Sequence, residues 1–208
     1  MVILILDYFL GIIMKKILAS SALALCLQSL SPVLYAGQMS TAEKQGLVKD
    51  AKTQIMSLAG ALTATLKQGI KTDGHAASVK LCNLQAPAIT KASSIEGGTT
   101  EWTVSRTSLK LRSPANVPEG WVEQIMKDFE QRKANGEPAE NIAHTEVRDG
   151  KFYLVKAIPT KADCLACHGS NIAEDVKSKL ADLYPNDKAA GFNVGDIRGV
   201  FVASKELK

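Results

Sequence analysis

The chain has 208 residues, of which 46% are hydrophobic and 22% are charged, and its mean hydropathy is zero. These values are typical of a globular protein with one core or two small ones, and they exclude a disordered, collagen-like or fibrous chain. The formal charge of +4 is too small to indicate a protein that binds nucleic acid.

The first 36 residues have the features of a secretory signal peptide. Met14, Lys15 and Lys16 begin a basic segment, a long apolar run follows, and Ala36 ends a cleavage site. We expect translation to begin at Met14, because the upstream apolar run of about 12 residues is too short to span a bilayer. Cleavage removes two lysines and one aspartate, so the charge of +4 becomes +3. We therefore expect a periplasmic protein, attached to the membrane only if this segment stays uncleaved, with residues 37–208 as one domain.

A long helix is predicted at the start of this domain. Ser40 and Glu43 form a capping box, and apolar residues recur with helical spacing over residues 48–70. A helix of about 30 residues is about 45 Å long. Residues 71–74 are expected to break it.

A second helix is predicted after this break. Val79, Cys82 and Ala86 lie on one face of it, so we expect Cys82 to point toward the core. Pro87 and the polar stretch 93–100 are expected to disrupt this helix.

The rest of the chain alternates between strand and helix patterns. Asp149-Gly150, between two apolar segments, is a strong hairpin signal. A long N-terminal helix followed by antiparallel strands with interspersed helices indicates an α+β domain rather than a doubly wound one. The other predicted elements are strands near residues 102–111 and 197–203, a helix over 121–129 that stops near Gly136, and a helix over 172–183.

The cysteines carry the most specific motif. Cys164-Leu165-Ala166-Cys167-His168 matches the attachment signature of haem c, in which two thiols add to the haem vinyl groups and the histidine binds the iron. Two other interpretations stay open. They are a disulfide between Cys164 and Cys167, and a zinc site formed by these two with His168 and Cys82. Export and the adjacent histidine favour one covalent haem.

The sixth iron ligand is the next question. Cys82 is an unpaired thiol on a predicted core face, and thiolate is an established haem ligand. The alternative is that Cys82 is a small buried hydrophobic residue, and the residues alone do not decide between the two. The other candidates are His75, His144, Met39, Met56 and Met126.

Several segments of the sequence are distinctive when taken together. They are Arg106-Thr107-Ser108-Leu109-Lys110, Arg112-Ser113-Pro114-Ala115-Asn116-Val117-Pro118, residues 164–169, Tyr184-Pro185-Asn186-Asp187, Gly191-Phe192 and Gly195-Asp196-Ile197-Arg198-Gly199. In this order they resemble the family of single-haem c-type proteins with a PAS-like fold. This family was long described as a domain of unknown function, and it also forms the periplasmic sensing part of bacterial signalling proteins. The resemblance implies a PAS-like antiparallel sheet with a long N-terminal helix, and His168 and Cys82 as the axial pair.

Further residues are candidates for the haem pocket. Arg106 and Arg112 are expected to pair with the haem propionates, because guanidinium groups bind carboxylates in bidentate fashion. Tyr153, Ile158 and Leu165 are expected to form the pocket wall.

The expected function is electron transfer or redox response without substrate chemistry. A His/Cys haem should have a low potential, because thiolate stabilises ferric iron. The expected partner is a redox protein or a small gaseous ligand, and the alternative function is a haem-based gas or redox sensor that signals to a separate protein. A peroxidase-like enzyme is disfavoured, because the sequence shows no distal His-Arg pair.

Overall fold

The computed structural model describes residues 39–94 and 100–207. The predicted signal peptide, residues 1–36, lies outside this part of the chain. Within the described ranges no helix is both long enough and apolar enough to cross a bilayer. The description below concerns the unit that begins at Thr41.

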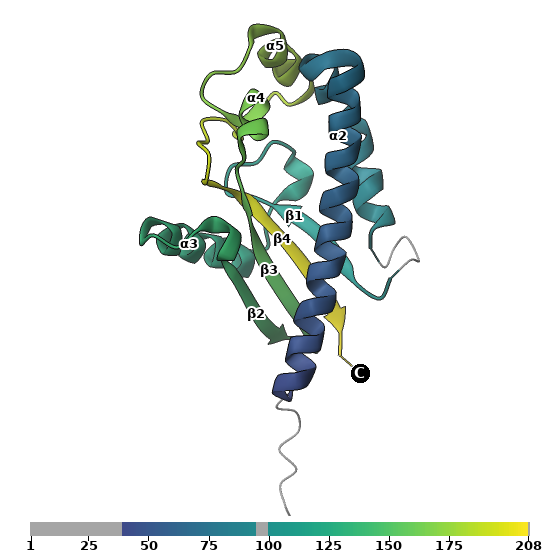
Figure 1. Ribbon diagram of the computed structural model, residues 1–208, viewed down its shortest axis with the longest axis vertical. Helices are drawn as coiled ribbons and strands as arrows, with labels where there is room; N and C mark the ends of the chain where they lie inside the picture. Colours follow the sequence, from purple (N-terminus) through teal and green to yellow (C-terminus); the bar gives the residue numbers. More distant parts are fainter. Residues whose placement is uncertain (1–38, 95–99, 208) are drawn as a thin grey trace, which may run out of the picture. The chain divides into compact units, whose positions relative to one another are not determined.

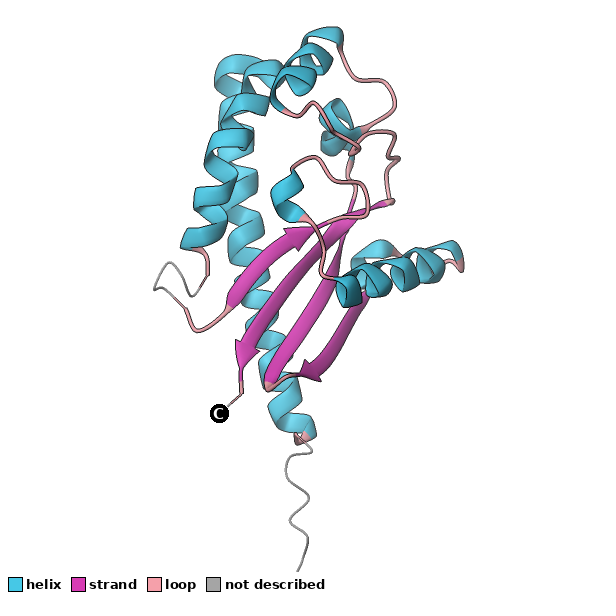
Figure 2. Ribbon diagram, turned by 180° about the vertical axis from the view of Figure 1, so that it is seen from behind, coloured by secondary structure: helices cyan, strands magenta, loops and turns pink. Residues whose placement is uncertain are grey.

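Helix α2 (Thr41–Ala92) consists of two arms joined at Gly74, whose φ of 79° and ψ of 179° are not helical. The two arms lie side by side (Figures 1 and 2), and Gly69 of the first arm faces Ser78 and Leu81 of the second. The predicted break is therefore confirmed. Pro87 lies inside the second arm, however, and the helix ends only at Ala92. A proline deprives the helix of one N–H donor, and the remaining hydrogen bonds carry the helix through to the polar stretch.

Four strands form one antiparallel sheet in the order β1-β4-β3-β2. The predicted hairpin is confirmed, with Asp149 and Gly150 at φ values of 51° and 74°, as a primed turn requires. The first strand stops earlier than predicted, because Ser108 turns the chain by accepting a hydrogen bond from the backbone N–H of Lys110. The strands are β1 (Thr103–Thr107), β2 (Ala143–Arg148), β3 (Lys151–Pro159) and β4 (Ile197–Glu206).

Helices cover both faces of the sheet. Helix α3 (Gly120–Ala134) packs on one face, where Phe129 and Met126 are fully buried against Val155 and Val200. The first arm of α2 crosses the opposite face (Figures 1 and 2), with Ala51, Ile55 and Leu58 buried. The sheet and its helices give the α+β architecture that the sequence predicts.

The segment with the cysteine motif lies between β3 and β4. It contains the short helix α4 (Leu165–His168) and helix α5 (Glu174–Leu183). Helix α5 packs on the second arm of α2 through Val79, Val176 and Leu180. Three turns of 3-10 helix complete the described structure: η2 (Pro114–Asn116), η3 (Ala139–Asn141) and η4 (Ala162–Cys164).

Candidate haem site

The cysteine motif lies on a tight helical turn directly after strand β3. Turn η4 and helix α4 follow each other, with backbone hydrogen bonds from the Cys164 N–H to the Lys161 carbonyl and from Gly169 to Leu165, both 2.9 Å long. Residues three apart in such a turn lie on the same side, so Cys164 and Cys167 share a face. The local structure therefore presents two thiols and the following histidine together.

The ring of His168 is held in one orientation. Its Nδ1 lies 2.7 Å from the Ala189 carbonyl oxygen, and Phe192 packs edge-on against the ring at 6.4 Å between centroids. Nδ1 donates its proton to this carbonyl, which leaves the lone pair on Nε2. Burial, with the charges of Arg198 and Arg112, lowers the pKa of His168 to about 3. A neutral imidazole whose Nδ1–H is bound to a backbone carbonyl is the usual form of a metal-binding histidine.

The Arg198 guanidinium lies against the same ring. Its Nε is 3.1 Å from Nδ1 and 3.5 Å from Nε2 of His168, and it donates from Nη1 to Ser108 Oγ at 3.2 Å. Nδ1 cannot both donate to Ala189 and accept from Arg198, and the shorter contact is the one to Ala189. Arg198 thus places a cation beside the histidine, and burial lowers its pKa to about 10.

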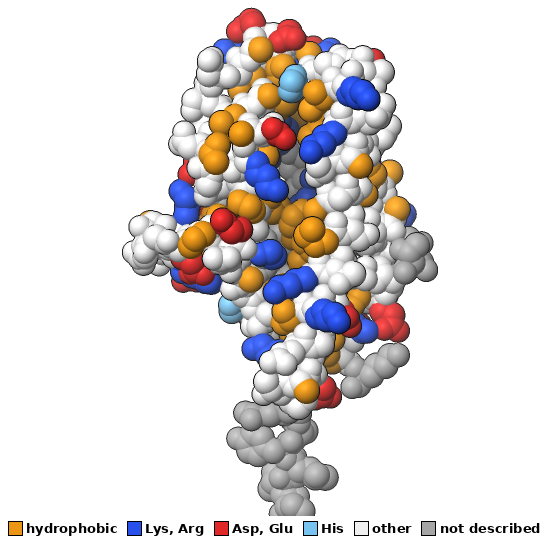
Figure 3. All heavy atoms as spheres, in the orientation of Figure 1, with side chains coloured by type: hydrophobic (Ala, Val, Ile, Leu, Met, Phe, Trp, Pro, Cys, Tyr) orange, Lys and Arg blue, Asp and Glu red, His pale blue; other side chains and the backbone are white. Residues whose placement is uncertain are grey.

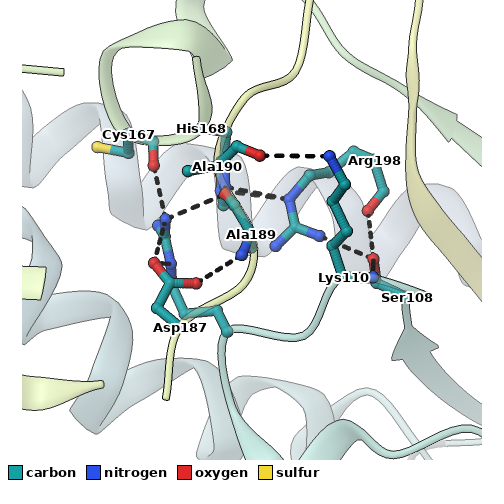
Figure 4. A network of polar contacts seen from close by, with 9 residues as sticks. Ser108, Lys110, Cys167, His168, Asp187, Ala189, Ala190 and Arg198 are labelled. Carbon is teal, nitrogen blue, oxygen red and sulfur yellow. Dashed lines mark hydrogen bonds and ion pairs between the residues drawn. The ribbon is translucent and has the colours of Figure 1, made fainter. Parts of the chain in front are cut away.

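Arg112 links the backbone at Cys167 to the backbone at Ala189 through hydrogen bonds. It donates to Asp187 Oδ2 at 2.9 to 3.0 Å, to the Cys167 carbonyl at 2.6 Å and to the Ala189 carbonyl at 3.3 Å. Asp187 in turn accepts from the Ala189 N–H at 2.8 Å. Figure 4 shows how these contacts join Cys167, His168, Asp187 and Ala189. Arg112 is therefore occupied by protein groups, whereas the sequence predicted that it binds a propionate.

Cys82 lies near the other two thiols. It follows Val79 by one helical turn, and Val79 belongs to the apolar cluster on which Cys167 packs. Burial raises the pKa of the Cys82 thiol, and the positive charges of Arg106 and Arg112 oppose this rise. The pKa of Cys167 is also raised, first by burial and further by the proximity of Cys82 and Cys164. The structure thus brings the three cysteines into one neighbourhood.

The geometry does not favour the two alternative interpretations of the cysteines. Cys82, Cys164 and Cys167 are all free thiols. Among the described residues, no three His, Cys, Asp or Glu side chains gather closely enough to hold a metal ion. A zinc site needs four such ligands in a tetrahedron. A haem needs only two protein ligands, one on each side of the iron.

Arg106 carries a positive charge for which the described residues offer no ion-pair partner. The residue is half-buried on β1, and in the described part of the chain its guanidinium has neither a hydrogen bond nor an ion pair. Burial lowers its pKa, and the nearby Cys82 and Tyr184 oppose this shift. A partly buried guanidinium without a partner is costly, so its surroundings fit an added carboxylate or thiolate.

The three predicted residues of the pocket wall lie in different places. Leu165 is half-buried between the two cysteines of the motif, and Ile158 is half-buried near the end of β3, opposite Gly199. The structure does not bring Tyr153 to the cysteines. Its ring packs against Trp121 of α3, with centroids 4.8 Å apart.

Four of the other candidates for the sixth ligand lie elsewhere in the fold, and Met39 precedes the unit that begins at Thr41. His75 is exposed just after Gly74, and His144 is hydrogen-bonded to Glu146 on β2. Met126 is buried in the core under α3, and Met56 is 68% exposed on α2. Cys82 is therefore the candidate that the fold places beside the motif.

Sequence reasoning did not assign roles to Asp187, Ala189 and Arg198. Asp187 and Arg198 are part of segments that carry the family resemblance, so the sequence offered a signal for them. The part played by Ala189 depends on its backbone carbonyl, which no residue pattern reveals.

Comparisons with known proteins bear on the family and the fold of the chain. A model of the Tll0287-like family matches residues 34–205, which is most of the chain. The chain belongs to the Tll0287-like family. Among solved structures, it is similar to the cyanobacterial haem-protein Tll0287, with a TM-score of 0.54 and 25% sequence identity. That match covers 80% of this chain and 97% of the other. No curated protein sequence matches the chain.

Proposed function

We propose that this member of the Tll0287-like family is an exported c-type haem protein that transfers electrons. Cys164 and Cys167 would hold one haem covalently, and His168 and Cys82 would bind its iron. The observation that carries the proposal is the hydrogen bond from His168 Nδ1 to the Ala189 carbonyl at 2.7 Å, directly after two free thiols at the required spacing. The similarity to a protein described as a haem-protein supports it.

The charges near the cysteines fit the anionic groups of a haem. Arg106 lacks a protein partner in the described ranges and lies close enough to Cys82 to alter its pKa. Its guanidinium can therefore pair with a propionate or stabilise the Cys82 thiolate. Arg198 adds a second cation with no carboxylate within ion-pair distance in the described ranges. Arg112, which is already bound to Asp187, would act on the backbone of the motif rather than on a propionate.

A bound haem would supply one-electron redox chemistry, and the protein would set its potential. A thiolate ligand donates electron density and favours ferric iron, so the potential should be low. An axial Cys82 would also fill the coordination position that a peroxidase leaves open, which supports a carrier rather than an enzyme. As part of the same proposal, the sheet is a PAS-like sheet and the protein is located in the periplasm.

The partner in this proposal is a redox protein. The face of the domain in Figure 3 shows basic side chains interspersed with hydrophobic and acidic ones, and the net charge is small. Nucleic-acid-binding proteins usually present a continuous basic stripe instead.

Replacement of Cys82 tests the axial pair. Cys82→Ala should keep the covalent haem, change the ferric spectrum to a high-spin or water-ligated form, and raise the potential, because the negative ligand is lost. His75→Ala, an exposed residue on the same helical arm, is the matched control and should change neither. An unchanged spectrum and potential in Cys82→Ala would refute Cys82 as the ligand. Ready CO binding by the reduced wild-type protein would favour the sensor function over the carrier.

A further inference from the structure

Both the backbone N–H and the backbone carbonyl of Ala189 form hydrogen bonds with side chains. Its N–H donates to Asp187 Oδ1 at 2.8 Å, and its carbonyl accepts from both His168 Nδ1 at 2.7 Å and Arg112 Nη2 at 3.3 Å. Arg112 and Asp187 pair with each other, and each of the two side chains is only 14% exposed. The carbonyl that orients the histidine is thus shared with an arginine whose charge is balanced by one carboxylate.

We propose that Arg112 and Asp187 are positioning residues for His168 and that they move the reduction potential of the haem in opposite directions. This inference rests on the proposed haem ligation by His168. In this proposal, an ion pair that does not itself touch the iron would adjust how strongly His168 donates electron density to it.

The effect of Arg112 on the reduction potential follows from its sharing the Ala189 carbonyl with His168. A carbonyl that accepts two hydrogen bonds is a weaker acceptor for each, so Arg112 limits the strength of the bond from His168 Nδ1. A weaker bond leaves the imidazole less electron-donating, and the guanidinium charge also disfavours ferric iron. Loss of Arg112 should therefore lower the potential.

The effect of Asp187 has the opposite sign. Its carboxylate neutralises Arg112 and also influences the buried Arg198. Asp187→Asn keeps an oxygen that can accept from the Ala189 N–H but removes the negative charge. The uncompensated guanidinium should then favour ferrous iron and raise the potential.

Potentiometric titration of the purified holoprotein tests this inference. At a fixed electrode potential, Arg112→Gln should increase the ratio of oxidised to reduced haem by about threefold, and Asp187→Asn should decrease it by about threefold. Threefold corresponds to roughly 28 mV for a one-electron couple. The matched controls are Arg132→Gln and Glu137→Gln, which alter an ion pair on the surface near the end of α3, and they should leave the ratio unchanged.

The signs separate tuning from a merely structural role. A structural role would lower the midpoint of unfolding in both variants and move both potentials in the same direction or not at all, and either result would overturn the inference. If Arg112→Gln fails to yield holoprotein, the potential of Asp187→Asn is sufficient for the test. A lower or unchanged potential in Asp187→Asn refutes the proposal. A wild-type protein without covalent haem would instead refute the proposed function.

Discussion

Ser94 holds strand β1 to the end of helix α2 through both polar backbone groups of Val104. Its hydroxyl donates to the Val104 carbonyl and accepts from the Val104 N–H, each at 3.0 Å. Ser94 is 4% exposed and Val104 is 1% exposed. Because β1 is an edge strand, the serine takes the place that a neighbouring strand would otherwise occupy. Two residues further on, the same strand carries Arg106.

Ser94→Ala should destabilise the protein substantially. The substitution leaves one buried N–H and one buried carbonyl without a partner, and each such group costs about 1–3 kcal/mol. Since the backbone can relax in part, we expect a total loss of about 2–4 kcal/mol. For a domain of this size that loss lowers the melting temperature by roughly 4–16 °C. Urea unfolding followed by far-UV circular dichroism measures the loss without interference from haem absorption.

Ser105→Ala provides the matched control, because Ser105 is exposed on the same strand. Its free energy of unfolding should change by less than about 0.5 kcal/mol. If Ser94→Ala is equally mild, the hydroxyl does not substitute for a strand partner. The account of how β1 is held, and with it the placement of Arg106, would then be refuted.

Three further predictions follow from local geometry and sequence. A methyl group at Gly69 would meet a terminal methyl of Leu81 at 2.5 Å and Ser78 Oγ at 3.1 Å, and both side chains must shift to admit it. Gly60→Ala, in open space, should stabilise the helix by about 0.5–1 kcal/mol in urea unfolding, whereas Gly69→Ala should lose most or all of this gain. The hydrogen bond from Lys133 is the largest of several causes that lower the pKa of Asp196 below its usual 3.8. The ionised carboxylate therefore adds stability above about pH 4, and this stability is lost as the pH falls through the pKa of the folded protein. Asp196→Asn should therefore flatten the acid side of the stability profile, and an unchanged profile would contradict this. N-terminal sequencing of the periplasmic protein should begin at Gly37, and recovery of the intact signal segment from membranes would show an uncleaved anchor.

Features encoded by adjacent residues could be predicted from the sequence. The hairpin at Asp149-Gly150 and the break at Gly74 are both present, because each depends on the backbone freedom of one or two residues. The same holds for the spacing of Cys164, Cys167 and His168, which lie on one short helical turn. Local patterns are also sufficient to assign helices α3 and α5.

Features that depend on distant contacts could not be predicted. The pairing of Arg112 with Asp187 joins residues 75 positions apart, and only the folded chain shows that the arginine is already occupied. The alternation of β3 places Tyr153 on the opposite face of the sheet from Phe152 and Leu154, but it does not show which face lies near the cysteines. The helix continues through Pro87 even though a local rule predicts disruption there.

Covalent attachment of haem through Cys164 and Cys167 is the central claim, and acid–acetone extraction combined with intact mass spectrometry tests it most directly. Thioether bonds survive acid, whereas coordinate bonds to iron do not. We predict that the colour stays with the precipitated protein and that the measured mass exceeds that of the polypeptide by one haem. Colour in the organic layer, together with the mass of the bare polypeptide, would contradict the account.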